Sequence, residues 1–263
     1  MRIVRVLTGD GRTVYGSLQD DNSVREIEGD VLGSYRLTDR MVDVKKMLAP
    51  IQPPNILCIG GNYRRHIEEG GGKIPEVPPI FMKPTTALNN PGDPIRLPAD
   101  APDEVDYEAE IAIVIGKLAR NVSVADAPDY ILGYCCVNDV SARDCQLRRD
   151  IQWTRGKGFD TFCPAGPFIH TTVNPNHLRI RSILNGKVMQ DSNTSDMIFS
   201  CADLVSYLSH QFTLLPGTLI CTGTPEGVGF ARKPPVFLRP GDTITVEIEQ
   251  LGSLTNPVVG PEG

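Results

Sequence analysis

Three acidic residues stand in segments whose other residues are mostly apolar. Segment 105–115 alternates in the manner of a β-strand, which places Glu108 and Glu110 side by side on one face. Residues 111–115 are all apolar, which favours burial on both faces, and a buried acidic pair is costly without a partner. Asp139 ends a second apolar run. Because hard divalent cations prefer carboxylate oxygens, we predict that Glu108, Glu110 and Asp139 bind one such cation.

Simpler interpretations of these acids stay open on the residues alone. Two glutamates on one face of an edge strand are usually solvated. Ser141 and Asp144 have the spacing of a helix capping box, so Asp139 would lie just before a helix N-terminus, where negative charge is favoured.

A histidine and a glutamate follow the next apolar strand pattern, residues 56–59. His66 and Glu69 are three residues apart and would face each other on a helical turn. A carboxylate beside an imidazole raises its basicity, as a general base requires, although an isolated pair of this kind is usually a surface ion pair. Gly70–Gly72 follow directly, so we expect segment 64–73 to be a mobile lid.

Two glycine-rich segments could approach a ligand closely. Lys157 lies between Gly156 and Gly158, and we expect a side chain with little packing role in an open turn. Segment 222–229 follows an apolar strand and is typical of an anion-binding loop, although a plain glycine-rich turn is the alternative.

Composition narrows the class of function. The chain has 263 residues, a net charge of −6, 40% hydrophobic and 22% charged residues. An acidic chain without clustered Lys and Arg is not expected to bind nucleic acid. No apolar run approaches the ~18 residues that a membrane helix needs, and the N-terminus does not have the pattern of a signal peptide. Seven cysteines without C-x-x-C spacing predict buried free thiols, no zinc site and a cytoplasmic location.

The elements that must position these residues divide into two parts. Residues 1–52 predict a small β-rich module with a hairpin of strands 2–7 and 13–18, followed by a short helix over 38–48. Residues 53–263 predict a β-dominated catalytic domain of the α+β class with a mixed sheet. Its expected strands are 56–59, 80–82, 107–115, 134–137, 167–169, 179–184, 218–222 and 243–248. A tight turn is expected at Asn185–Gly186, and short helices after Ser123, after Ser141 and over 201–212.

Six motifs in order give a specific resemblance over about residues 55–260. They are Gly60-Gly-Asn-Tyr-Arg-Arg-His66, Lys83-Pro84, the segments 106–117 and 138–144, Gly156-Lys-Gly-Phe-Asp-Thr-Phe-Cys-Pro164 and Thr222-Gly-Thr-Pro-Glu-Gly-Val-Gly229. Together they resemble the fumarylacetoacetate hydrolase superfamily. The resemblance implies a mixed β-sandwich roll, assembled as a homodimer.

The resemblance also implies roles for individual residues. Glu108, Glu110 and Asp139 match the metal triad, which Mg²⁺ or Mn²⁺ usually occupies, with Ca²⁺ as an alternative occupant in crystals. Catalytic positions are matched by Lys157 and by His66 and Glu69, the dyad of the lid. Substrate-contacting positions are matched by Arg143, Gln146 and Thr224.

The implied chemistry is that of a metal-bound enolate of a 2-oxo acid. It would support C–C bond hydrolysis of acylpyruvates or fumarylpyruvate, or decarboxylation of oxaloacetate. The alternative is an oxaloacetate tautomerase or an isomerase of the hydroxymuconate or 2-hydroxyhepta-2,4-diene-1,7-dioate type, and Arg148, Arg149 and Trp153 resemble the mitochondrial oxaloacetate-acting members. A second alternative is a non-catalytic protein that binds a 2-oxo acid or Ca²⁺.

Overall fold

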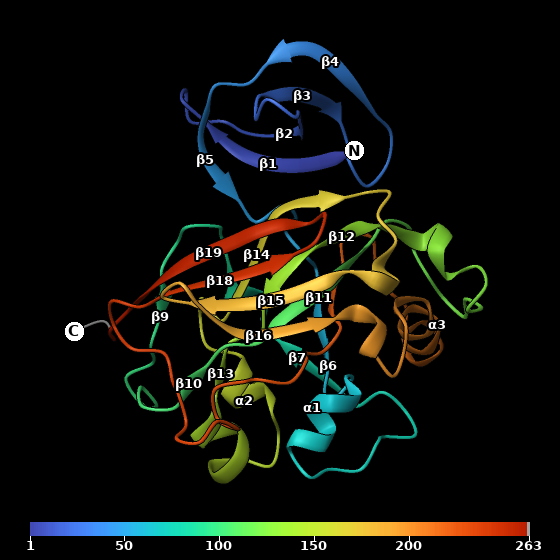
Figure 1. Cartoon of the computed structure of the whole chain (residues 1–263). Helices are drawn as coiled ribbons and strands as arrows, with labels where there is room; N and C mark the ends of the chain where they lie inside the picture. The colour runs from blue at the N-terminus through green and yellow to red at the C-terminus, as the bar shows by residue number, and fades with distance from the viewer. Residues whose placement is uncertain (262–263) are drawn as a thin grey trace.

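The computed structural model describes residues 1–261, and β-strands dominate it (Figure 1). A 12-stranded sheet runs in the order β4-β3-β2-β1-β14-β12-β11-β17-β6-β7, with β5 paired to β1 and β8 paired to β14. Its strands are β1 Arg2–Thr8, β2 Thr13–Leu18, β3 Val24–Gly29, β4 Tyr35–Met41, β5 Val44–Leu48, β6 Ile56–Ile59, β7 Ile80–Lys83, β8 Leu88–Asn89, β11 Ala109–Ile115, β12 Ile131–Asn138, β14 Cys163–His170 and β17 Leu219–Cys221.

A second, five-stranded sheet has the order β16-β15-β18-β19-β9, and two short strands, β10 and β13, pair separately. The bounds are β9 Ile95–Arg96, β15 Arg179–Leu184, β16 Lys187–Asn193, β18 Thr243–Ile248, β19 Gly252–Val259, β10 Val105–Asp106 and β13 Ser141–Ala142. Most pairs are antiparallel, but β6–β17, β8–β14 and β9–β19 are parallel. The predicted α+β class with a mixed sheet is therefore confirmed. Each strand expected after residue 55 is present: β6, β15 and β18 have the expected ends, and the ends of the others are shifted.

Helices are few and short in the described residues. They are α1 Arg64–Glu69, α2 Thr154–Lys157 and α3 Cys201–Gln211, with 3-10 turns at Thr85–Ala87, Ala127–Tyr130, Pro175–His177 and Thr194–Asp196 and a π-helical turn at Cys145–Arg149. The predicted start of α3 is confirmed, because Ser200 and Asp203 form a reciprocal capping box. Ser123 and Asp126 also make capping contacts, but only one 3-10 turn follows, with Pro128 near its start.

The helix expected to begin after Ser141 is wrong. Ser141 and Ala142 form β13, which pairs with β10, and the Ser141 hydroxyl donates to the Asp139 carbonyl oxygen instead of capping a helix. The N-cap is Asp144, whose side chain accepts the Cys145 N–H at the start of the π-helical turn. A helix that began at Ser141 would lose the backbone hydrogen bonds between β10 and β13.

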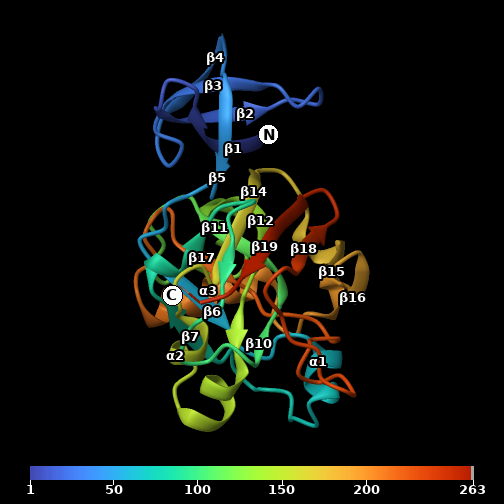
Figure 2. The ribbon, with the colours of Figure 1, turned by 90° about the vertical axis from the view of Figure 1, so that its left-hand side faces the viewer.

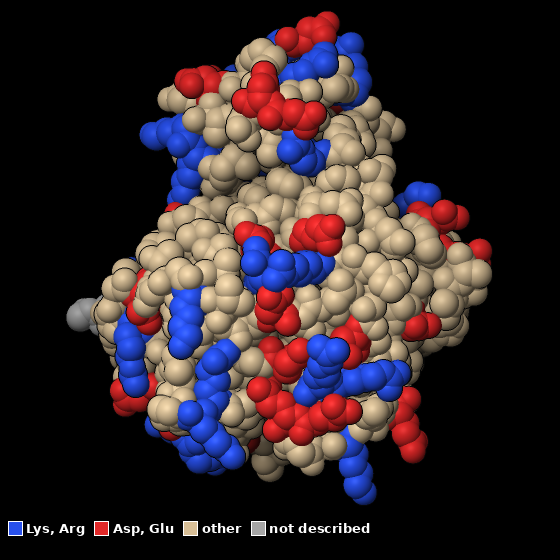
Figure 3. All heavy atoms as spheres, viewed as in Figure 1, with Lys and Arg blue, Asp and Glu red and all other residues tan. Residues whose placement is uncertain are grey.

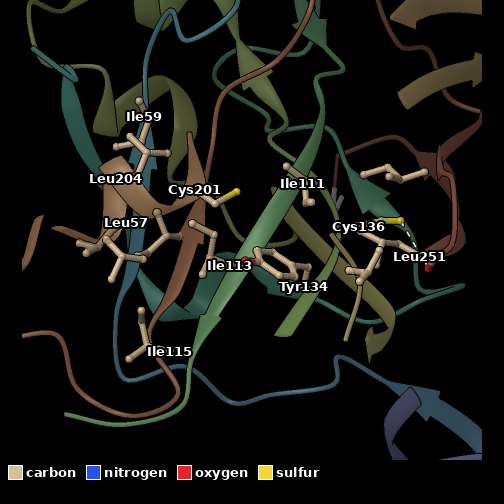
Figure 4. Close-up of a cluster of buried hydrophobic side chains, with 14 of the residues drawn as sticks. Leu57, Ile59, Ile111, Ile113, Ile115, Tyr134, Cys136, Cys201, Leu204 and Leu251 are labelled. Atoms are coloured by element: carbon tan, nitrogen blue, oxygen red, sulfur yellow. Dashed lines mark hydrogen bonds between the residues drawn. The ribbon is translucent and has the colours of Figure 1, made fainter. Parts of the chain in front are cut away.

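One apolar core joins the two sheets and α3 (Figure 4). Odd-numbered residues of β11, such as Ile111 and Ile113, meet Tyr134 of β12 and Leu204 of α3. Ile248 of β18 belongs to the same cluster, so the five-stranded sheet covers this face of the larger one. Every residue of β11 is buried, which makes the strand a rigid base for the residues at its start.

The N-terminal strands β1–β5 form the upper part of the molecule, and α1 and α2 lie at the opposite end (Figures 1 and 2). The predicted hairpin is confirmed, because β1 pairs with β2 from Ile3↔Ser17 to Leu7↔Thr13. The helix expected over 38–48 is wrong, since β4 pairs with β3 and β5 pairs with β1. β-branched Thr38, Val42 and Val44 favour this extended chain. β1 also pairs with β14, so the larger sheet runs through both parts.

All seven cysteines are free and buried, as the sequence predicts. Burial raises the pKa of the Cys58 thiol to about 11, which keeps it protonated and unreactive. Over residues 1–261, no helix has the length and apolar character needed to cross a membrane.

Candidate active site

The three predicted acidic residues meet at one end of β11 and β12. Glu108 and Glu110 flank the first residue of β11, Asp139 directly follows β12, and the Asp139 N–H donates to the Glu108 carbonyl oxygen at 3.0 Å. One carboxylate oxygen from each lies within 4.8 Å of the others. The exposed fractions are only 5%, 1% and 1%. β11 lies between β12 and β17, so the interpretation as a solvated edge pair is wrong.

The carboxylates of this triad differ in their surroundings. Burial raises the pKa of Glu110 well above its usual range, and the neighbouring Asp139 and Glu108 carboxylates raise it further. Among the described residues one backbone N–H, from Gly223, donates to Glu110, and the φ of 96° at Gly223 is one that glycine readily adopts. No cationic side chain among residues 1–261 forms an ion pair with Glu110, whereas Glu108 and Asp139 each have such partners, so the Glu110 oxygens in particular fit a hard divalent cation. The triad can therefore hold such a cation.

Lys157 is buried beside this triad and is not in an open turn, so its expected lack of packing is wrong. It ends α2, is 2% exposed, and its Nζ donates to Glu108 Oε2 at 2.7 Å and to Asp139 Oδ2 at 2.9 Å. Burial would lower the pKa of Lys157, but Asp139 and Glu108 raise it overall. Burial alone would likewise raise the pKa of Glu108, yet Lys157 and Arg143 bring it down to about 2. Lys157 thus stays charged and keeps one N–H for a ligand.

Arg143 is held by protein groups on nearly every side. Its Nε and Nη2 donate to Asp106 Oδ2 at 2.9 and 2.8 Å, its Nη2 lies 2.8 Å from Glu108 Oε1, and its Nη1 donates to Gln146 Oε1 at 2.8 Å. The guanidinium carbon also lies 4.4 Å from the ring centre of Phe230. These contacts use every guanidinium N–H except one on Nη1. Arg143 can therefore offer a substrate a single hydrogen bond, while the amide nitrogen of Gln146 is left for the cavity.

Thr224 is buried at 3% exposure, and its hydroxyl is fully oriented by the protein. The hydroxyl donates to the Ala109 carbonyl oxygen at 2.9 Å and accepts from Gln190 Nε2 at 2.8 Å. A carbonyl oxygen can only accept, so the single hydroxyl proton is not free for a substrate carboxylate. The hydroxyl positions the loop after β17, and the substrate contact of Thr224, which lines the cavity, stays a prediction.

Substitution of Thr224 should therefore act on stability before it acts on substrate binding. We expect Thr224→Val to lower the free energy of unfolding by about 1–3 kcal/mol, because Ala109 and Gln190 lose their partners. Thr224→Ser keeps the hydroxyl and is the matched control. Thermal unfolding and KM measured on both variants check this. A large rise in KM with an unchanged melting temperature would show that the hydroxyl binds substrate directly.

His66 and Glu69 lie on α1, as predicted, but they do not form a tight pair. His66 Nδ1 is 3.6 Å from Glu69 Oε2, which is beyond hydrogen-bond distance, and this buried nitrogen has no hydrogen-bond partner within residues 1–261. The Glu69 carboxylate accepts the Gly227 N–H at 3.1 Å, and the Arg65 N–H donates to Asp196 at 3.1 Å. Burial would raise the pKa of Glu69, but His66 and Gly227 lower it. These contacts close α1 over the cavity, and mobility of the lid stays a prediction.

A cavity of about 140 Å³ brings most of these side chains together. Its wall includes His66, Glu108, Glu110, Arg143, Gln146, Lys157 and Thr224. Trp153 and Phe81 close one side, with ring centres 5.6 Å apart. A larger groove of about 860 Å³, lined by Arg2, His170 and Arg181 among others, contains none of the predicted site residues. The smaller cavity is therefore the candidate active site.

Three buried residues that organise the site were missed by the sequence analysis. Asp106 accepts the N–H groups of Gly229 and Phe230 as well as Arg143, and Gln190 holds Thr224. Lys83 lies beside Asp139. Asp106 and Lys83 stand within the quoted motifs, but their spacing does not show what they touch, and no motif contains Gln190.

A family model described as fumarylacetoacetate (FAA) hydrolase C-terminal matches residues 55–259. The chain belongs to the fumarylacetoacetate hydrolase family. It is an enzyme of this family that acts on a small molecule, so the alternative of a non-catalytic binding protein is not supported. A second model, described as Rv2993c-like, N-terminal, matches residues 1–50.

Relatives of the family cover most or all of the chain. The Xenopus laevis protein named oxaloacetate tautomerase fahd2, mitochondrial, is 47% identical over 218 residues, which are 81% of this chain and 68% of that protein. Protein Rv2993c of Mycobacterium tuberculosis is 46% identical over 270 residues, 98% of either chain. The crystal structure of 2-hydroxyhepta-2,4-diene-1,7-dioate isomerase from Mycobacterium marinum has a TM-score of 0.88 at 45% identity, with 99% of this chain and 98% of that chain covered.

Proposed function

We propose that this enzyme interconverts the keto and enol forms of small 2-oxo dicarboxylates such as oxaloacetate. The observation that carries the proposal is the cavity of about 140 Å³, which Glu108, Glu110, one lysine and one histidine line, with Asp139 of the triad beside the two glutamates. This volume is well below the ~300–1,000 Å³ of pockets that enclose drug-sized ligands, so it suits a short acid. The relative named oxaloacetate tautomerase supports the same chemistry.

The residues would divide the reaction among them. Glu108, Glu110 and Asp139 would hold a Mg²⁺ or Mn²⁺ ion, which as a Lewis acid would favour the enolate of the substrate. His66 lines the cavity and takes the proton from C3, and the resulting imidazolium returns it to the C2 oxygen. The reaction consumes no water, and His66 ends it in the protonation state in which it began. Lys157 stays charged and directs its remaining N–H to the developing negative charge.

Three further activities share the enolate and are the alternatives to this proposal. Hydrolysis of acylpyruvates, or decarboxylation of oxaloacetate, would use the same residues around a C–C bond. Isomerisation of a longer dioate is suggested by the name of the Mycobacterium marinum protein. A seven-carbon dioate would need Trp153 or α1 to move outward, because both border the cavity.

A substrate panel with Mg²⁺ tests the proposal. It compares keto and enol oxaloacetate, acylpyruvates, fumarylpyruvate and 2-hydroxyhepta-2,4-diene-1,7-dioate, with interconversion followed by ultraviolet absorbance. We expect kcat/KM to be highest for oxaloacetate interconversion. A preference for a longer dioate or for C–C cleavage would contradict it.

Removal of one triad charge should weaken cation binding. We expect Glu110→Gln and Asp139→Asn each to raise the Kd for Mn²⁺ by about 100-fold or more, because a buried acceptor charge is lost. Titration followed by Mn²⁺ electron paramagnetic resonance measures this without substrate. Glu104→Gln, a partly exposed acid paired with Arg148, is the matched control and should leave the Kd unchanged. An unchanged Kd in both triad variants would place the cation elsewhere.

Other properties stay predictions of the same proposal. They are a homodimeric assembly, a cytoplasmic location, the absence of nucleic-acid and membrane partners, and the division into parts 1–52 and 53–263. Lys and Arg are interspersed with Asp and Glu on the face that Figure 3 shows. Ultracentrifugation measures the assembly directly.

A further inference from the structure

Lys83 is a lysine with no exposure to solvent at its side chain, and it does not line the cavity. It ends β7, next to α2. Its Nζ donates to the carbonyl oxygens of Val140 at 3.1 Å, of Phe162 at 2.8 Å and of Lys157. A buried ammonium is costly unless its charge and its N–H groups are matched, so this placement requires a reason.

A carboxylate supplies the matching charge. Lys83 Nζ lies 2.6 Å from Asp139 Oδ1, although the three carbonyl oxygens occupy the ammonium N–H directions and Oδ1 accepts no well-aligned hydrogen bond. The other oxygen, Oδ2, accepts from Lys157. Asp139 therefore lies between two ammonium groups, one at each oxygen, which fixes the rotation of its carboxylate.

The four partners of Lys83 come from the chain segments that carry the active site. Val140 follows Asp139, the Lys157 carbonyl belongs to the residue whose side chain faces the triad, and Phe162 lies in the segment after α2. One ammonium thus ties β7 to the end of β12 and to the C-terminus of α2. A backbone carbonyl at a helix C-terminus also favours a positive charge nearby.

We propose that Lys83 is a positioning residue that orients Asp139 for the divalent cation and sets the place of Lys157, without touching substrate. The part that concerns turnover rests on the proposed function, whereas the part that concerns the cation does not. Groups behind a metal ligand typically change metal affinity by about 10- to 100-fold when they are removed. Loss of Lys83 should change the affinity for the cation and kcat more than KM. Loss of an ordinary core residue would not produce this pattern.

The experiment measures Mn²⁺ affinity, kcat and KM for Lys83→Met, which keeps the length of the side chain and removes the charge. We expect Kd for Mn²⁺ to rise about 10- to 100-fold and kcat to fall, with KM changed less than threefold. Ile248→Ala, a core variant in β18, controls for a general loss of stability and should leave Kd unchanged. Lys46→Met, which breaks a half-exposed pair with Asp93, controls for loss of a lysine.

A double-mutant cycle keeps the test decisive if Lys83→Met folds poorly. In Lys83→Met combined with Asp139→Asn, the carboxylate charge that Lys83 matched is also removed. We therefore expect the double variant to melt above Lys83→Met, and its loss of Mn²⁺ affinity to be far smaller than the product of the two single losses. Additive effects in the cycle, or a wild-type Kd in Lys83→Met, would overturn the proposal. Since Mn²⁺ titration needs no substrate, failure of the tautomerase assay alone would leave this test intact.

Discussion

Lys157→Met is expected to remove nearly all turnover and also to destabilise the protein. The ammonium lies between Glu108 and Asp139 at 2.7 and 2.9 Å, and its loss leaves two buried carboxylates without this partner. Breaking a buried ion pair by removing one member typically costs about 3–5 kcal/mol. This differs from the sequence-based expectation that the Lys157 side chain has little packing role. Thermal unfolding and kcat on oxaloacetate, both measured with and without Mg²⁺, check the prediction.

The cation dependence of this variant separates two roles of Lys157. Because a divalent cation binds only the folded protein, Mg²⁺ should raise the melting temperature, and by more in Lys157→Met than in the wild type, since it replaces part of the lost charge. Activity should stay lost even with saturating Mg²⁺. Lys117→Met, at an exposed lysine, is the matched control and should change neither quantity. Wild-type stability in Lys157→Met would contradict the role as a buried counter-charge.

His66→Ala is expected to lower the rate of some reactions strongly and of others only slightly. Loss of a positioned general base typically costs about 10²- to 10⁴-fold in rate, so keto–enol interconversion should fall by that factor. Hydrolysis of an acylpyruvate, which needs an activated water, should fall similarly. Decarboxylation of oxaloacetate needs no base, so it should change by less than about tenfold. All three rates are measured on one preparation.

Two comparisons make the outcome for His66 interpretable. His177→Ala removes an exposed histidine and should leave every rate unchanged. Glu69→Gln should cost less than His66→Ala, because Glu69 lies 3.6 Å from the ring and is held mainly by the Gly227 N–H. Equal losses in interconversion and decarboxylation would show that His66 only positions the lid and does not transfer a proton.

Sequence patterns located the acidic cluster because alternation and apolar flanks are local properties. Glu108 and Glu110 share a face through period two alone, and Asp139 reaches them because β11 and β12 pair at Ala109↔Asn138. The turn at Asn185–Gly186 was equally predictable, since its φ angles of 50° and 80° suit these residue types.

The remainder of the site depends on contacts that are distant along the chain. The glycines on both sides of Lys157 suggest a solvated side chain. Its burial comes from a contact with Glu108, which lies 49 residues away in the sequence. The helix expected over 38–48 failed because β1 and β3 supply pairing partners that local propensity does not register. The motif around Thr224 likewise does not show that Gln190, 34 residues away, donates a hydrogen bond to its hydroxyl.

Because every cysteine is buried, the reactivity of the native thiols can be used to measure local opening of the structure. A thiol reagent added to the native enzyme can modify a cysteine only while the surrounding strands are apart, so the labelling rate follows the free energy of opening. No cysteine precedes Cys58. Labelling would therefore follow the opening of the part with the active site and would not register separation of β2–β5. Comparison with amide hydrogen exchange in β2–β5 would then show whether the two parts of the chain unfold together.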